Sequence, residues 1–183
     1  MPLSAATPLN APPRAALPAM PPRTPPRHAL PDAKLPRPPL VVAGETCSRT
    51  LRLSREDIAA FARLSGDSNP LHHDAIAAQR AHHGEIIASG QHSTALLIGL
   101  ASSYFSRPGD GFGRELLCLN FNFAFKAPVF ADQLLALSWQ VASVEWHATL
   151  GGLLAQVDGR AAVRDSHPAV VSRATLLVKT APA

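Results

Sequence analysis

Hydrophobic and polar residues alternate along several stretches of the chain. The clearest is 117–126, where Leu or Phe at every second position is followed by Cys, Asn, Ala or Lys. A period of two is typical of a β-strand with one apolar face. Residues 47–53, 134–145, 153–163 and 170–179 are further strand candidates, and turn-forming residues separate the last three. The pattern predicts a sheet of four or five antiparallel strands.

Two stretches have helical spacing instead. Ser54 and Asp57 are placed as in a capping box, and apolar residues follow at helical intervals up to Gly66. Residues 94–105 are apolar on nearly every face, and Ser89 is the expected N-cap of that second helix. Because a helix of this kind must bury all its sides, we expect it in the middle of the domain.

One curved antiparallel sheet wrapped around the apolar helix satisfies both patterns, since each element would otherwise expose apolar surface. This α+β arrangement is the hot-dog architecture, expected as a single domain over residues 43–183. Phe121, Phe123 and Phe125 are expected to pack against the helix. A ferredoxin-like or lipocalin-like arrangement is the alternative, although neither needs a helix that is apolar on all sides.

Proline dominates the start of the chain. Of the 18 prolines, 13 lie in residues 1–40, where they remove backbone donors and fix φ. We expect residues 1–42 to form a disordered or partly polyproline II arm. A docking or localisation tail is the other interpretation, and a transit peptide is disfavoured because the prolines prevent an amphipathic helix.

Charge and cysteine content exclude several classes of function. The net charge of +4 lies within residues 1–40, and the neutral remainder offers no basic stripe for nucleic acid. Cys47 and Cys118 are far apart, so neither a disulfide scaffold nor a cysteine-based zinc site is predicted. The longest apolar run, 86–105, is too polar to span a membrane. We expect a cytoplasmic protein.

Titratable side chains gather in the loop 66–74. Asp67 and His72 lie on either side of Pro70, so a turn can bring both toward one pocket. A carboxylate beside an imidazole can hold a water molecule and move a proton either way near neutral pH, as reversible hydration requires. In the other interpretation, Asp67 only caps the turn and His72 is an ordinary polar loop residue.

Three segments resemble the family of MaoC-like dehydratases and R-specific enoyl-CoA hydratases. They are residues 61–74, with a D-x-N-P-x-H core, residues 84–90, and residues 122–132, with the run Lys-Ala-Pro-Val-Phe-Ala-Asp. The resemblance covers roughly residues 47–180. It implies a hot-dog fold, a homodimer, an acyl-thioester substrate carried by CoA or acyl carrier protein, and neither metal nor organic cofactor.

The resemblance also assigns roles. It places the catalytic pair at Asp67 and His72, and the carbonyl-binding glycine at Gly90, whose N–H at a helix start would stabilise an enolate oxygen. Alternatively, Gly90 only permits a tight entry into the helix. Asn69 is expected to order the loop through backbone hydrogen bonds. Ser89 stands where many members have His, which leaves the acyl specificity open.

Together with these residues, the resemblance implies reversible hydration of trans-2-enoyl thioesters to R-3-hydroxyacyl thioesters. A thioesterase is one rival, disfavoured because residues 89–106 contain no Asp or Glu. A non-catalytic protein that binds acyl chains or a partner is the other. Five histidines between positions 72 and 92 raise the question of a metal site, but their spacing fits no known ligand pattern, so none is predicted.

Overall fold

The computed structural model describes residues 40–109, 111–163 and 166–181. Residues 1–39 of the arm expected over residues 1–42 therefore lie outside the described residues. Of the three described residues of that arm, Val41 is buried, with 2% of its surface exposed. The carbonyl of Leu40 also accepts a hydrogen bond from Arg114.

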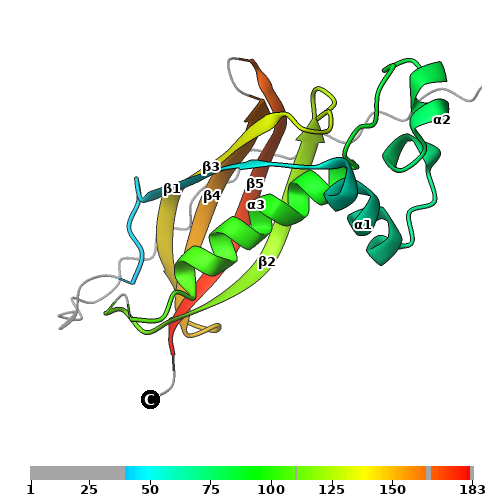
Figure 1. Cartoon of the computed structure of the whole chain (residues 1–183). Coiled ribbons are helices and arrows are strands. Elements are labelled where there is room, and N and C mark those ends of the chain that lie inside the picture. Colours follow the sequence, from blue (N-terminus) through cyan, green and yellow to red (C-terminus); the bar gives the residue numbers. More distant parts are fainter. Residues whose placement is uncertain (1–39, 110, 164–165, 182–183) are drawn as a thin grey trace, which may run out of the picture. The chain divides into compact units, whose positions relative to one another are not determined.

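Five antiparallel strands form one sheet (Figure 1). The order across the sheet is β1-β3-β4-β5-β2, so β1 and β2 are its edges. The strands are β1 (Thr46–Arg52), β2 (Arg114–Phe125), β3 (Leu134–His147), β4 (Gly152–Val163) and β5 (Pro168–Thr180). Each overlaps a stretch that the alternation pattern predicts, which confirms the strand predictions.

The helices follow β1 and come before β2. They are α1 (Arg55–Ser65), the 3-10 helix η1 (Pro70–His72), α2 (Ala75–Arg80) and α3 (Gly90–Phe105). The longest, α3, lies across one face of the sheet and contacts all five strands (Figure 1). The arrangement is the predicted hot-dog fold. Helix α2 was not predicted; it has only six residues, and the Asp74 side chain caps it by accepting from the N–H groups of Ile76 and Ala77.

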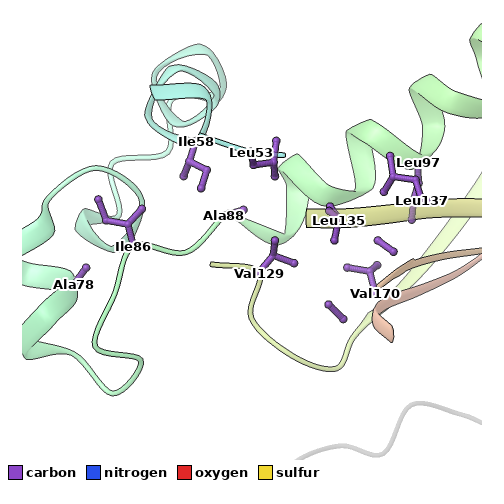
Figure 2. Packing of buried hydrophobic residues seen from close by; sticks show 12 residues of the cluster. Leu53, Ile58, Ala78, Ile86, Ala88, Leu97, Val129, Leu135, Leu137 and Val170 are labelled. Atoms are coloured by element: carbon purple, nitrogen blue, oxygen red, sulfur yellow. The ribbon is translucent and has the colours of Figure 1, made fainter. Parts of the chain in front are cut away.

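Two clusters of buried apolar side chains form the core. One lies where α1 and the start of α3 meet the sheet, and Figure 2 shows members from these helices and from the strands. They include Leu53, Ile58, Leu97, Leu135 and Val170. The second cluster lies beneath the end of α3, where Phe105 stacks on Trp139 with ring centroids 5.1 Å apart. Together the clusters fix α3 to the sheet along its length.

Helix α3 is buried on one face only. Leu97, Ala101 and Phe105 face the sheet and are at most 3% exposed. The opposite face is exposed and carries small or polar residues: Gln91, Ala95, Gly99, Ser102 and Ser103. The expectation that every side of this helix is buried is wrong for the single chain, because the sheet covers it from one side.

A β-bulge breaks the alternation in β2. The register against β5 shifts between Cys118 and Asn120, which leaves Leu119 without a directly opposed partner. A bulge puts the residues on its two sides out of phase. Phe121 therefore faces inward opposite the buried Ala174, whereas Leu117 and Leu119 are 56% and 48% exposed.

The three phenylalanines of β2 also differ in burial. Phe121 and Phe123 are half-buried and stack on each other with centroids 4.4 Å apart. Phe125, at the end of the strand, is 57% exposed. The expectation that all three belong to the core is wrong for Phe125.

Candidate functional site

The end of α1 sets the position of Asp67. Gly66 adopts the left-handed conformation at φ 71°, which terminates the helix. The Asp67 N–H then bonds back to the carbonyl of Ala62 at 2.8 Å. Although Asp67 lies in a loop, this hydrogen bond from its backbone N–H ties it to the last turn of α1.

Asn69 and one oxygen of Asp67 order that loop. The Asn69 N–H donates to Asp67 Oδ1 at 3.0 Å, and Asn69 Oδ1 accepts from the Leu71 N–H at 3.2 Å. The second bond caps η1, the turn of 3-10 helix that carries His72. The turn-capping interpretation of Asp67 therefore accounts for Oδ1 and leaves Oδ2 for another partner.

The His72 ring is held from its other side. Its Nδ1 lies 2.7 Å from the carbonyl oxygen of Ile87. Since a carbonyl can only accept, Nδ1 carries the proton, and Nε2 of the neutral ring presents a lone pair. That Nε2 lies 3.5 Å from Asp67 Oδ2.

The facing atoms of this pair are both acceptors when His72 is neutral. They cannot bond to each other, but a water molecule can donate one hydrogen to each and keep its lone pairs free. The His72 side chain is 7% exposed and the Asp67 side chain 27%, so solvent reaches the pair from the side of the carboxylate. The geometry suits activation of a water molecule.

Ser89 and Gly90 form the start of α3. Ser89 is 4% exposed, and its Oγ accepts from the His92 N–H at 3.2 Å, so the predicted N-cap is present. Gly90 is the first helical residue, where N–H groups have no acceptor within the helix. A Cβ at this position would lie 2.7 Å from two atoms of the Phe125 ring, so the close approach favours glycine.

Asp67 and Gly90 line two different clefts. Asp67 lines one of about 370 Å³ together with Ala62, Arg63, Gly66, Ser68 and His73. Gly90 lines another of about 410 Å³, whose wall also includes Ile87. The carbonyl of Ile87 holds the His72 ring, so one residue of the Gly90 cleft contacts the pair. The structure brings Asp67 and His72 together, whereas Gly90 lies in the other cleft.

His92 is a residue near the site to which the sequence pattern gave no role. Its ring stacks on Phe61 of α1, with centroids 4.4 Å apart and planes 4° from parallel. Burial lowers its pKa, and the carboxylate of Asp57 partly opposes that shift. The only signal in the sequence is its place two residues after Gly90. By contrast His73, His82 and His83 are exposed.

The model of the MaoC-like domain family matches residues 40–151. The chain belongs to the MaoC-like family. Among solved structures, this MaoC-like chain is similar to an (R)-hydratase from A. caviae involved in PHA biosynthesis, with 25% identity and a TM-score of 0.65. The likeness covers 78% of the chain and 98% of that hydratase. No match is found among the curated proteins.

Two further structures share the MaoC-like fold. The unliganded R-hydratase PhaJ1 of Pseudomonas aeruginosa has 24% identity and a TM-score of 0.61, over 78% of this chain and 86% of that one. The HadBC (3R-hydroxyacyl-ACP dehydratase) complex of Mycobacterium tuberculosis has 18% identity and a TM-score of 0.62, over 76% and 98%. At the level of the family, the match to the MaoC-like domain and the likeness to the (R)-hydratase support hydratase or dehydratase chemistry for this chain.

Neither a cluster of metal ligands nor a membrane-spanning helix is found in the described part of the chain. Within residues 40–109, 111–163 and 166–181, no three His, Cys, Asp or Glu side chains come together as metal ligands. In the same part of the chain, none of the helices combines the length and the apolar character needed to cross a membrane.

Proposed function

We propose that this MaoC-like protein adds water reversibly to trans-2-enoyl thioesters and forms R-3-hydroxyacyl thioesters. The observation that carries the proposal is the 3.5 Å approach of Asp67 Oδ2 to His72 Nε2. Each partner is oriented by a separate backbone contact, Asp67 through Asn69 and His72 through Ile87. Preorganised acceptors of this kind hold a water molecule without further rearrangement.

In the hydration direction, the water oxygen forms a bond to C3 of the enoyl group. The electrons of the C2=C3 double bond move toward C2 and the thioester carbonyl, which gives an enolate. Asp67 and His72 accept the proton that the water loses and return a proton to C2 on the same face. The Gly90 N–H donates to the carbonyl oxygen, where the partial positive charge of the helix start stabilises the enolate.

A homodimer forms part of the proposal. Among the described strands, β2 pairs only with β5, and it carries the exposed Leu117 and Leu119. Exposed apolar side chains on an unpaired edge favour pairing with a second chain. Light scattering should give the mass of two chains for the wild type, and Leu117→Lys should shift the mass toward one chain.

The test of the reaction uses enoyl thioesters on both CoA and acyl carrier protein. We expect loss of the enoyl group, an R-3-hydroxyacyl product and no free thiol, whereas a thioesterase would release thiol. Asp67→Asn should reduce turnover about 10²- to 10⁴-fold, the usual effect of losing a positioned acid or base. An Asn side chain can still accept from the Asn69 N–H, so the loop should keep its form.

Asp158→Asn is the matched control, because that carboxylate is half-exposed on β4 and pairs with Arg173. It should hydrate at the wild-type rate. An Asp67→Asn variant with unchanged hydration would refute the mechanism. Thiol release by the wild type would favour the thioesterase, and thioester binding without any turnover would favour a non-catalytic role. A cytoplasmic location stays a prediction.

A further inference from the structure

The cleft beside the start of α3 has an aromatic side chain that the proposed reaction does not use. Phe125 is 57% exposed, yet its Cε1 and Cζ atoms lie 2.7 Å from the place of a Cβ on Gly90. The edge of the ring therefore rests on the α-carbon of Gly90. Both residues line the same cleft of about 410 Å³.

Core packing does not account for this position. Phe121 and Phe123, on the same strand, are half-buried and stack on each other, whereas Phe125 leaves more than half of its surface in water. An aromatic ring contributes to stability mainly through the apolar area that it buries. Within the single chain, Phe125 contributes little in that way.

The lining of the cleft suits an acyl chain on a carrier arm. Its apolar wall consists of Ile87, Ala88, Pro128, Val129 and Val170. Polar groups accompany this wall: the buried Ser93 and the exposed Gln91, His83 and Lys126. An apolar wall with a few polar groups is typical of a small-molecule site. Lys126 adds a cation that suits the phosphate of a phosphopantetheine arm.

A thioester carbonyl that accepts from the Gly90 N–H lies about 2.9 Å from that nitrogen. The acyl group attached to this carbonyl then enters the cleft that Gly90 and the Phe125 ring both line. A flat, unbranched acyl group can pass along the face of the ring. A methyl branch on C2 widens the acyl group at the point of contact.

We propose that Phe125 is a specificity-determining residue that admits unbranched acyl thioesters to the Gly90 amide and excludes those branched at C2. This inference rests on the proposed function, because that function gives the Gly90 amide its ligand. Binding and hydration can nevertheless be measured separately.

The experiment compares the affinities of the full chain for butyryl- and isobutyryl-pantetheine by NMR titration. Pantetheine is the arm that CoA and acyl carrier protein share, and saturated acyl groups cannot be hydrated. We expect the wild type to prefer butyryl, and Phe125→Ala to reduce this preference about tenfold, the effect typical of one methyl group in an apolar pocket. The preference of Phe125→Leu for butyryl should lie between those of the wild type and Phe125→Ala.

Trp146→Ala is the matched control, because Trp146 is an aromatic side chain of similar exposure, 50%, that does not line the cleft. It should keep the wild-type preference. Thermal unfolding checks each variant, and Phe125→Leu keeps the test decisive should Phe125→Ala fail to fold. An unchanged preference in both Phe125 variants would overturn the inference, as would a wild type that binds neither thioester.

Failure of the proposed function has a different signature. A wild type that discriminates the two saturated thioesters through Phe125 but hydrates no enoyl thioester would refute the reaction and support the role of Phe125. A wild type that hydrates enoyl thioesters, with no effect of Phe125 on the preference, would support the reaction and refute that role.

Discussion

Two pairs of a carboxylate and a nitrogen-bearing side chain show how differently one domain can use such groups. Asp67 and His72 both come before α3 in the chain, whereas in the second pair Glu45 precedes β1 and its partner Arg114 comes after α3. In this second pair, Arg114 is 1% exposed and its Nη1 lies 3.2 Å from Glu45 Oε1. The same nitrogen donates to the Leu40 carbonyl at 2.9 Å. The guanidinium also lies over the rings of Tyr104, Phe105 and Phe112.

The pair before α3 is arranged for another purpose. Asp67 and His72 are each tied to the backbone by one atom, and their remaining acceptors face each other at 3.5 Å. The Asp67 side chain stays 27% exposed. A pair whose donors and acceptors match fastens segments together, whereas a pair of facing acceptors leaves a place for a reactant. Substitutions at each pair can separate these two uses.

The largest expected effect is on the rate, at the pair before α3. His72→Asn should lower hydration about 10²- to 10⁴-fold, because the new side chain provides no base facing Asp67. An Asn amide can still donate to the Ile87 carbonyl, so the free energy of unfolding should change little. Enoyl-thioester hydration and urea unfolding measure the two quantities. A large loss of stability with normal turnover per folded molecule would reverse the roles assigned to the two pairs.

The largest loss of stability is expected at the pair of Arg114 and Glu45. Arg114→Met leaves Glu45 without its cation in a mostly buried place, which should lower the free energy of unfolding by about 3 kcal/mol. Adding Glu45→Gln should recover part of the loss, because no lone charge remains.

The exposed pair of Arg173 and Asp158 gives the control for this loss. The two side chains are 76% and 50% exposed, so Arg173→Met should cost less than about 1 kcal/mol. Urea unfolding of the four proteins measures the series. Equal losses for Arg114→Met and Arg173→Met would show that burial does not distinguish them.

A smaller effect is expected at the start of α1, the helix whose other end holds Asp67. Ser54 Oγ accepts from the Asp57 N–H at 3.1 Å, and Asp57 Oδ2 accepts from the Ser54 N–H at 3.0 Å. Ser54→Ala should cost about 1 kcal/mol of stability, and Ser54→Thr much less, since Thr can also cap a helix. Turnover per folded molecule should stay unchanged, because Asp67 is fixed at the other end of α1. Lower turnover in Ser54→Ala would extend the functional region to the whole helix.

The smallest effect is a pH dependence from His92. Burial lowers the pKa of the folded residue, against the ordinary value of 6.5 that the unfolded chain retains. Below pH 6.5 the unfolded chain therefore binds the proton more readily, and the free energy of unfolding falls as the pH falls toward the folded pKa.

His92→Phe keeps the stack on Phe61 and removes the titrating group. The variant should show a flatter fall in stability below pH 6.5 than the wild type, as measured by urea unfolding at a series of pH values. His82→Gln is the control, because His82 is exposed and should leave the profile unchanged. Identical profiles for His92→Phe and the wild type would contradict the assigned cause.

Much of the fold follows from local patterns in the sequence. The capping box at Ser54 and the glycine at position 66 define both ends of α1. Period-two alternation predicts every strand, because side chains on a strand must alternate between core and solvent. The β2 bulge is invisible to such patterns, since an extra residue at Leu119 reverses the faces without altering the alternation of residue types. The exposed side of α3 is equally hidden, because small residues suit both a buried and an open surface.

The five strands, helices α1 and α3, the hot-dog fold and the residue types of the candidate site could be predicted from the sequence, since capping, periodicity and a short loop motif act between near neighbours. Two features of the site came from tertiary packing alone: which nitrogen of His72 is tied to Ile87, and that Phe125 rests on Gly90. These contacts join residues from separate elements. Their geometry depends on how α3 and β2 pack against the rest of the domain, and no spacing along the chain encodes it.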